Sequence, residues 1–196
     1  MTNKSTTHPR FAISLVLLTF LLILSGQTTQ AMGKKKPHFV DTLKLHGYID
    51  NYGNVRLNNS PLTELPEPFD VEGFLDIEGS QIERLPDGLT VKGYVNASNT
   101  RLTRFPKIDV GGYINLTNSK VAVLPQGFKV NGDLSLSGTP IAALPRRLNV
   151  KGNLYLSNTR VESLPPDLSV GGDLYLRGSP VSTIPETVRV GGRIYR

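Results

Sequence analysis

Hydrophobic and polar positions repeat along this chain with a period of about twenty residues, from residue 53 to the last residue. The period is marked by a Leu-Pro pair or a close variant, found at Leu65-Pro66, Leu85-Pro86, Phe105-Pro106, Leu124-Pro125, Leu144-Pro145, Leu164-Pro165 and Ile184-Pro185. Successive prolines lie twenty residues apart, except for one step of nineteen between Pro106 and Pro125. A fixed period of this length predicts a solenoid, in which each repeat forms one coil that stacks on the next.

Within each repeat, the apolar residues alternate in the way expected of a strand. We number every coil from the leucine of its Leu-Pro pair, so that Leu85 is position 1. Apolar residues then occupy positions 5, 7, 11, 13 and 18, which in this coil are Leu89, Val91, Val95, Ala97 and Leu102. Alternation from position 5 to position 13 is strand spacing with one face turned inward.

Spacing typical of a helix is not sustained anywhere after residue 31. Proline at position 2 favours an extended backbone on the side opposite the strands. We therefore expect an all-β solenoid over residues 47–196, built from about seven coils of twenty residues. The coils are expected to contain short parallel strands and extended loops, with little helix outside the first 31 residues.

Three further positions carry information about the backbone. Position 9 is glycine in every coil, which predicts a bend or a close backbone approach. Position 15 is always Asn or Gly, the residues that best tolerate a positive φ angle, so we expect a turn out of the strand there. Position 16 is always Ser or Thr, and these hydroxyls are expected to hydrogen-bond turn amides that have no strand partner.

The combination of Leu-Pro, a later Leu-x-Leu, an asparagine-like corner and a further leucine resembles the short bacterial class of leucine-rich repeats, over roughly residues 47–196. The resemblance implies one short parallel strand per coil and a strand face that serves as the binding surface. The chain departs from the family pattern in two ways. Its Ser or Thr corner falls one place after the Asn or Gly position, and its Val-x-Gly alternation indicates a longer or a second strand. A flatter β-solenoid is therefore the alternative to a curved leucine-rich-repeat arc.

Residues 1–31 have the layout of a secretory signal peptide. Lys4 and Arg10 give a positive start, an apolar run follows over residues 11–24, and the segment ends in a small-x-small pattern at Ala31. We expect cleavage after Ala31 and export to the periplasm or the cell exterior. The alternative is an uncleaved N-terminal membrane anchor, although the apolar run is shorter than the ~20 residues of a usual spanning helix.

Charge and cysteine content narrow the range of partners. Residues 32–46 form a basic linker and the start of an N-terminal cap, with Lys34, Lys35 and Lys36 in a row. Loss of the signal peptide removes two of the 22 basic residues and none of the 16 acidic ones, which leaves a net charge of +4. No basic stripe with interleaved aromatic residues is present, so we expect no nucleic-acid partner. The chain has no cysteine, which excludes disulfide bonds and thiol chemistry.

The outward strand positions 10 and 12 carry the candidate binding residues. Because neighbouring strands lie ~4.8 Å apart, the residues at one position form a row across the coils. Six aromatic residues fall in these rows and are predicted to bind a protein or glycan ligand: Phe74, Tyr94 and Tyr113 at position 10, and Tyr155, Tyr175 and Tyr195 at position 12. The alternative is that these rings are cross-strand packing pairs, each worth ~0.2–1 kcal/mol, that only stiffen the sheet.

Few residues of the chain are suited to catalysis. His38 and His46 lie before the regular repeats and are too isolated to form a metal site or a catalytic triad. Asp133 and Asp173 are the best catalytic candidates, because they share position 10 two coils apart. Their spacing of ~10 Å is near the upper range for the carboxylates of an inverting glycosidase. Since paired aspartates also arise by repeat duplication, we expect no enzyme activity, no cofactor and no metal site.

The two ends of the repeat array bear on assembly. Residues 39–52 form a degenerate half-coil that is expected to cap the N-terminal end. Residues 190–196 end within a coil and are expected to form an edge strand. The charges of Arg193 and Arg196 disfavour pairing of this edge with another chain. We expect a monomer, with an end-to-end dimer as the alternative.

The favoured function is recognition of a ligand in the cell envelope or outside the cell. A structural or self-assembling envelope component is the second hypothesis and a glycan-active enzyme the third.

Overall fold

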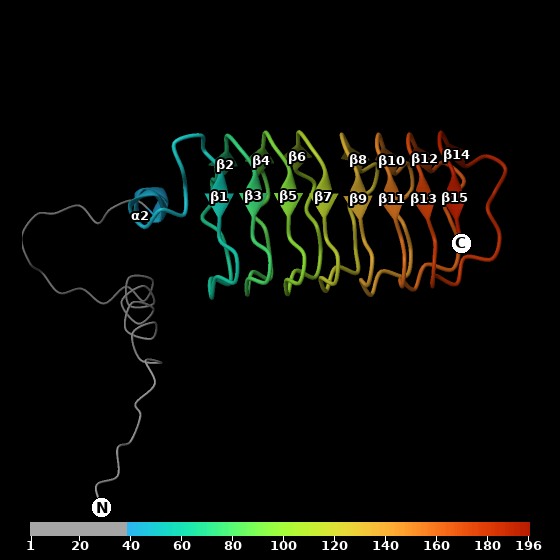
Figure 1. The fold of residues 1–196 in the computed structure, drawn as a ribbon, viewed down its shortest axis with the longest axis horizontal. Helices are drawn as coiled ribbons and strands as arrows, with labels where there is room; N and C mark the ends of the chain where they lie inside the picture. The colour runs from blue at the N-terminus through green and yellow to red at the C-terminus, as the bar shows by residue number, and fades with distance from the viewer. Residues whose placement is uncertain (1–38) are drawn as a thin grey trace, which may run out of the picture. The chain divides into compact units, whose positions relative to one another are not determined.

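The computed structural model describes residues 39–196 and shows a parallel β-solenoid of about seven coils, with ~20 residues per coil and one short helix (Figure 1). The expected all-β solenoid is confirmed. The predicted signal peptide, the Lys34 to Lys36 run and His38 lie outside the described residues. Within residues 39–196, no helix combines the length and hydrophobicity that crossing a membrane requires.

Each coil contributes two short strands rather than one long one. The odd-numbered strands form a continuous eight-stranded parallel sheet, here called the long sheet. Its members are β1 (Val55–Arg56), β3 (Leu75–Asp76), β5 (Val95–Asn96), β7 (Ile114–Asn115), β9 (Leu134–Ser135), β11 (Leu154–Tyr155), β13 (Leu174–Tyr175) and β15 (Ile194–Tyr195). Pairing follows the coil positions, so that Tyr155 lies opposite Tyr175 and Tyr175 opposite Tyr195. Equivalent positions of successive coils therefore lie beside one another, as the repeat predicts.

The even-numbered strands form a second sheet that is divided into two parts, here called the interrupted sheet. One part contains β2 (Asp70–Val71), β4 (Thr90–Val91) and β6 (Asp109–Val110), and the other contains β8 (Lys129–Val130), β10 (Asn149–Val150), β12 (Ser169–Val170) and β14 (Arg189–Val190). The division between β6 and β8 follows the coil that is one residue short. There the side-chain amide of Asn131 donates to the Val110 carbonyl at 3.0 Å. In five other coils the backbone amide at this position makes the equivalent bond, so a side chain bridges the break.

The hydrophobic core runs along the inside of the coils and consists of the inward residues of each repeat. Positions 11 and 13 are at most 2% exposed from Val55 to Leu176. Phe105 of the short coil and Phe128 of the next coil fill the core, with their ring centroids 5.4 Å apart. Burial of each large apolar side chain contributes about 1.5–3 kcal/mol relative to exposure. Stability is therefore spread over the whole stack of coils.

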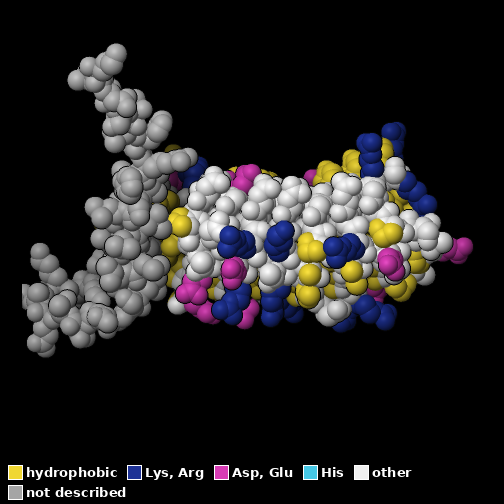
Figure 2. Space-filling view, turned by 90° about the horizontal axis from the view of Figure 1, so that it is seen from below, with side chains coloured by type: hydrophobic (Ala, Val, Ile, Leu, Met, Phe, Trp, Pro, Cys, Tyr) yellow, Lys and Arg dark blue, Asp and Glu magenta, His cyan; other side chains and the backbone are white. Residues whose placement is uncertain are grey.

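The corner after each long-sheet strand forms as the sequence predicts. All seven residues at position 15 have φ angles between 54° and 73°. The expected hydrogen bonds from turn amides to position 16 hydroxyls occur at the serines Ser60, Ser80 and Ser119. The three threonines and Ser179 instead donate to the carbonyl three residues earlier, as Thr159 does to Leu156 at 2.8 Å. Seen from this side, the surface consists mainly of uncharged polar side chains and backbone, with charged side chains at intervals (Figure 2).

Position 9 requires glycine because adjacent coils approach each other closely there. A Cβ atom on Gly93 would lie 2.8 Å from the carbonyl oxygen of Gly73, which is too close for a carbon atom. The backbone amide of Gly93 donates to this same oxygen at 2.8 Å. The predicted close approach is confirmed, and it falls between the two strands of the coil.

The two ends of the described solenoid differ in structure. At the N-terminal end, the expected half-coil begins instead with helix α2 (Phe39–Leu45), in which Leu43 is fully buried and joins the core. His46 follows the helix, and its Nδ1 hydrogen-bonds the Thr42 carbonyl at 2.8 Å. At the other end, Ile194 of β15 is 42% exposed on an edge strand that pairs only with β13.

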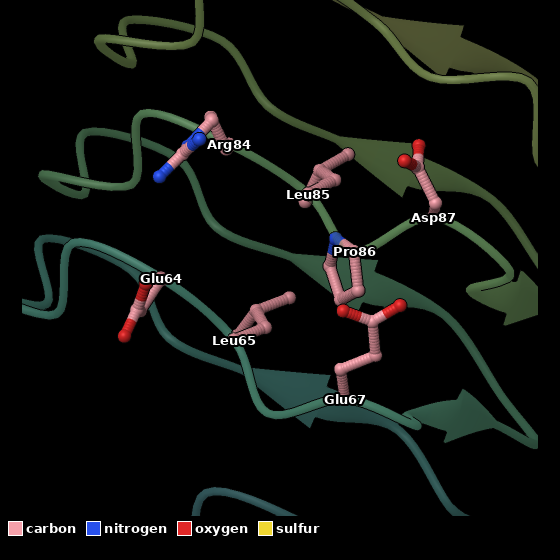
Figure 3. Close-up of a pocket in the computed structure, with 7 residues that line it drawn as sticks. All are labelled: Glu64, Leu65, Glu67, Arg84, Leu85, Pro86 and Asp87. Atoms are coloured by element: carbon pink, nitrogen blue, oxygen red, sulfur yellow. The ribbon is translucent and has the colours of Figure 1, made fainter.

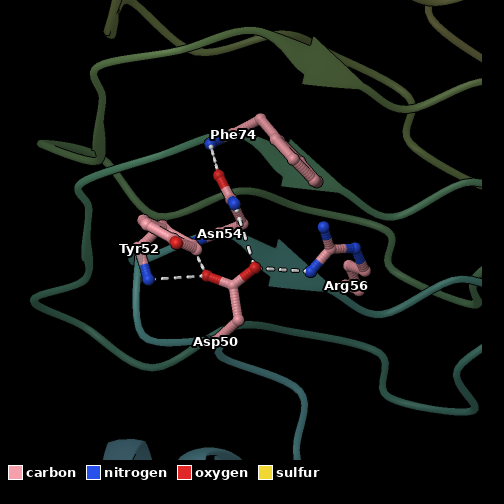
Figure 4. Close-up of polar contacts among 5 residues, drawn as sticks. All are labelled: Asp50, Tyr52, Asn54, Arg56 and Phe74. Atoms are coloured by element: carbon pink, nitrogen blue, oxygen red, sulfur yellow. Dashed lines mark hydrogen bonds and ion pairs between the residues drawn. The ribbon is translucent and has the colours of Figure 1, made fainter.

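Asp50 joins the cap to the first coil through four hydrogen bonds (Figure 4). It accepts from the backbone amides of Tyr52 and Asn54, from the Asn54 side chain, and from the Arg56 guanidinium, over 2.7–3.0 Å. The Arg56 guanidinium, followed by the Asn54 amide, holds the pKa of the Asp50 carboxyl well below its usual value. The carboxylate is therefore charged at neutral pH and fixes the start of the long sheet.

Candidate functional site

The outward side of the long sheet carries the aromatic residues that the sequence singled out. Side chains alternate along a strand, so positions 10 and 12 face outward where positions 11 and 13 face the core. All six predicted residues lie in these two outward columns, and the structure gathers them into two stacks of three rings. We call this surface the tyrosine face.

The first stack occupies position 10, immediately before strands β3, β5 and β7. The Phe74 and Tyr94 ring centroids are 4.7 Å apart with planes 9° from parallel, and those of Tyr94 and Tyr113 are 4.5 Å apart at 8°. The Arg56 guanidinium lies 4.7 Å from the Phe74 centroid, so a cation covers one end of the stack. At the other end Tyr113 is 41% exposed, and no further ring from residues 39–196 stacks on it.

The second stack occupies position 12, on strands β11, β13 and β15. The Tyr155 and Tyr175 centroids are 4.6 Å apart at 10°, and those of Tyr175 and Tyr195 are 4.7 Å apart at 8°. These distances match the spacing of neighbouring strands, because the strands are parallel and in register. Two phenol groups also contact polar residues of their own coil: Tyr155 accepts from Asn153, and Tyr175 donates to Asp173, each at 3.3 Å.

Two phenols of the stacks, those of Tyr113 and Tyr175, are less acidic than free tyrosine. Partial burial is the largest cause that raises the pKa of Tyr113 above 10.0, and the neighbouring Tyr94 adds to it. Partial burial likewise raises the pKa of Tyr175, with a further contribution from the Asp173 carboxylate. Both phenols are therefore neutral at physiological pH and can donate or accept hydrogen bonds.

Polar residues fill the column that the first stack leaves free at position 12. The Asn96 side chain donates to Asp76, and the Asn115 side chain donates to Asn96, each at 3.1 Å. Thr117 continues this network, since its hydroxyl donates to Asn115 and contacts the Ser135 hydroxyl, both at 2.7 Å. These contacts tie successive coils together along the tyrosine face.

Asp133 and Asp173, the best catalytic candidates of the sequence, occupy position 10 beside the second stack. One carboxylate oxygen of Asp133 accepts the backbone amide of Asn153, and one of Asp173 accepts that of Arg193, each at 2.7 Å. The side-chain oxygen of Asn153 likewise accepts the backbone amide of Asp173. The geometry therefore uses one oxygen of each aspartate to join neighbouring coils.

The two aromatic stacks do not meet, because the coil of β9 places no ring on this face. Asp133 and Ser135 stand at the positions where other coils carry aromatic residues. The result is a hollow of about 380 Å³, here called the central hollow, lined by Ile114 and by six outward residues: Tyr113, Asn115, Thr117, Asp133, Ser135 and Tyr155. Only Tyr113 and Tyr155 belong to the predicted site. Asp133 is one of the two catalytic candidates of the sequence, whereas Asn115, Thr117 and Ser135 carry no sequence signal that singles them out.

A smaller hollow of about 260 Å³ lies in the Leu-Pro loops of two neighbouring coils (Figure 3). Its charged lining consists of Glu64, Glu67, Arg84 and Asp87, which do not converge on one point in Figure 3. These side chains form no ion pair with one another. Within residues 39–196, no group of three or more His, Asp or Glu side chains is arranged to hold a metal ion. The tyrosine face is therefore the better candidate for a functional site.

Comparison with known protein families, with curated proteins and with solved structures found no match to this chain. The fold defines the chain as a β-solenoid repeat protein. The geometry and chemistry of the tyrosine face are therefore the evidence on function.

Proposed function

We propose that the protein is a binding module that recognises a protein or glycan ligand through its tyrosine face. The observation that carries this proposal is the gathering of six aromatic rings into two stacks on one outward surface, with Tyr113 and Tyr195 partly exposed. Tyrosine presents a large amphipathic contact area at low entropic cost. The neutral phenols add hydrogen-bond donors and acceptors to this area.

Packing of the rings on one another is compatible with this role. Each stacked pair contributes ~0.5–1.5 kcal/mol, so the rings also stabilise the long sheet. Because each middle ring is held between two others, it has little freedom left to lose when a ligand binds. A contact surface that is rigid beforehand binds with a smaller entropic penalty.

Residues 1–31 and the repeats support two further proposals, one on cell location and one on ancestry. Residues 1–31 are proposed to direct export to the periplasm or the cell exterior, on the basis of their charge and apolar pattern. The repeats are proposed to be related to the short bacterial leucine-rich repeats, on the basis of the Leu-Pro and Leu-x-Leu positions. The second strand in each coil favours the flatter β-solenoid arrangement over a leucine-rich-repeat arc.

We assign no catalytic reaction to the tyrosine face, because Asp133 and Asp173 each commit one carboxylate oxygen to a neighbouring coil.

Arrays of glycans and of extracellular proteins test the proposal. The purified protein is expected to bind at least one array component saturably. The triple variant Tyr155→Ser, Tyr175→Ser, Tyr195→Ser should bind that component at least tenfold more weakly, at a temperature where circular dichroism shows that it is folded. Tyr52→Ser is the matched control, because Tyr52 is 84% exposed and lies outside both stacks. Equal binding by the triple variant would show that the face is not the contact surface. Concentration-dependent size without saturable binding would favour a structural role instead.

A further inference from the structure

The central hollow lies in the middle of the tyrosine face and is lined by residues of β7, β9 and β11. These three strands are neighbours in the long sheet (Figure 1). Tyr113 ends the first stack and Tyr155 begins the second, so each ring has one face covered by a neighbouring tyrosine. The other face of each ring is turned toward the coil of β9. Since that coil carries Asp133 and Ser135 at its outward positions, no ring from it covers either tyrosine.

The gap between the two open ring faces has the thickness of one ring. Tyr113 and Tyr155 are two coil-to-coil steps apart, with the coil of β9 between them, which is ~9.6 Å along the stack at a strand spacing of ~4.8 Å. This equals about twice the 4.5–4.7 Å centroid spacing inside the stacks. The two tyrosines also differ by two positions along the strand, an offset of ~7 Å. One inserted ring therefore cannot cover both tyrosines, whereas two linked rings lying side by side over β9 can.

Two polar groups of the hollow, the Ser135 hydroxyl and the Asp133 carboxylate, offer acceptors to a ligand. The single hydroxyl hydrogen of Thr117 is donated to Asn115, so the 2.7 Å contact between Thr117 and Ser135 requires Ser135 to be the donor. Ser135 consequently offers only acceptor capacity to a ligand. The Asp133 carboxylate has a strong bond to the Asn153 amide through one oxygen, and its second oxygen has only a 3.4 Å contact. Asp133 is also the one charged residue in the lining.

We propose that the central hollow is a subsite for two linked pyranose rings of an uncharged glycan. This inference rests on the proposed function and names its ligand class. A pyranose ring presents a C–H face that packs on tyrosine and hydroxyl groups that donate to acceptors such as Asp133 and Ser135. The negative charge of Asp133 disfavours sugars that carry carboxylate or phosphate groups. The volume of about 380 Å³ lies at the lower end of the range for ligand sites, which suits two sugar rings.

Titration calorimetry on the purified protein tests the ligand class. The probes are glucose, mannose and galactose, their cello-, manno- and galacto-oligosaccharides of two to six units, and tri-galacturonate as the charged comparison. At least one neutral series should bind saturably, and at least tenfold more tightly than tri-galacturonate. Binding should strengthen from one unit to two, because the second ring adds contact with the second tyrosine. Absence of binding by every neutral series, or tighter binding of tri-galacturonate, overturns the proposal.

Filling the gap tests the location. In Ser135→Tyr, the new ring would extend the second stack by one rung and occupy the space of a sugar ring. Binding should fall at least tenfold, while the melting temperature is unchanged or raised. Ser157→Tyr is the matched control, since it makes the same chemical change on the same face outside the hollow lining and should leave binding unchanged. Wild-type affinity in Ser135→Tyr overturns the proposal.

A conservative change tests the acceptor role of Asp133. In Asp133→Asn the bond to the Asn153 amide should survive, because Asn54 and Asn153 already accept the equivalent amides at this position. Loss of the charged acceptor should weaken binding of the neutral probe about tenfold and narrow the preference over tri-galacturonate. An unchanged affinity and preference would contradict the assigned chemistry.

The proposal and the broader function fail in different ways. A ligand whose binding depends on Tyr175 and Tyr195 but survives Ser135→Tyr would leave the tyrosine face as the contact surface and remove the hollow as a subsite. A ligand indifferent to all of these variants would remove both.

Discussion

Removal of the middle ring of a tyrosine stack should destabilise the protein about twice as much as removal of an end ring. Tyr175 stacks on two rings, at 4.6 Å and 4.7 Å, whereas Tyr155 stacks on Tyr175 alone. A stacked pair contributes ~0.5–1.5 kcal/mol beyond area burial. The stacking free energy lost is therefore ~1–3 kcal/mol in Tyr175→Ser and ~0.5–1.5 kcal/mol in Tyr155→Ser. The two variants should lose similar amounts of stability from burial and hydrogen bonding. Both side chains are half-buried, and each phenol has one hydrogen-bond contact at 3.3 Å.

Equilibrium unfolding in urea, followed by far-ultraviolet circular dichroism at pH 7, measures both losses. Tyr175→Phe and Tyr155→Phe are the matched controls, because they keep the ring and remove only the hydroxyl. Both should stay within ~1 kcal/mol of the unchanged protein. In the first stack, Tyr94→Ser removes the middle ring and Tyr113→Ser removes an end ring. The first change should likewise lower the free energy of unfolding about twice as much as the second. Equal losses at middle and end rings would refute the reasoning that stability accumulates pair by pair along a row.

Three further changes test other parts of the fold. In the core, Leu136→Ala should lower the free energy of unfolding by ~2–5 kcal/mol and unzip more coils than Leu57→Ala, because a central coil supports neighbours on both sides. Hydrogen exchange that shows equally extensive damage in both variants would contradict this. At the short coil, Asn131→Ala should cost ~0.5–1.5 kcal/mol through loss of the bond to Val110, with faster amide exchange centred on β6 and β8. Exchange that rises evenly along the chain would count against a local bridge. At the cap, Asp50→Asn should destabilise the protein at pH 7, and the difference should shrink as the pH falls below the ordinary value of 3.8. The lowered folded-state pKa stabilises the protein above that pH, and this contribution is lost as the carboxylate is protonated on further acidification. A difference that is the same at pH 7 and pH 2.5 would disprove this role.

The repeat period predicts the stacking of coils because side chains at equal positions can be buried together only if the coils align. The same alignment explains why position 15 could be predicted from residue type, since Asn and Gly share tolerance of the positive φ found there. The Val-x-Gly alternation predicts a longer or a second strand in each coil, but it does not decide between the two. Apolar alternation continues on both sides of Gly93, and only contact with Gly73 in the neighbouring coil reveals the interruption. Helix α2, with seven residues, is too short to give a reliable helical period.

The candidate site could be predicted in part. The six aromatic residues follow directly from the outward positions of the repeat. The central hollow forms because the coil of β9 has no ring at either outward position, while Tyr113 and Tyr155 flank it. The role of Asp133 depends on the backbone amide of Asn153, which lies twenty residues away. Such contacts between coils become apparent only when the chain is stacked in three dimensions.

Disulfide trapping tests the row alignment on which the whole account depends. The chain has no cysteine of its own, so introduced pairs report on a clean background. Asn115 and Ser135 are register partners on neighbouring strands, whereas Asn115 and Tyr155 are two strands apart, ~9.6 Å, which exceeds the ~7 Å that a disulfide can bridge. The account predicts rapid oxidation of the pair Asn115→Cys with Ser135→Cys and none of the pair Asn115→Cys with Tyr155→Cys. Equal oxidation of both pairs, or preference for the second, would contradict it.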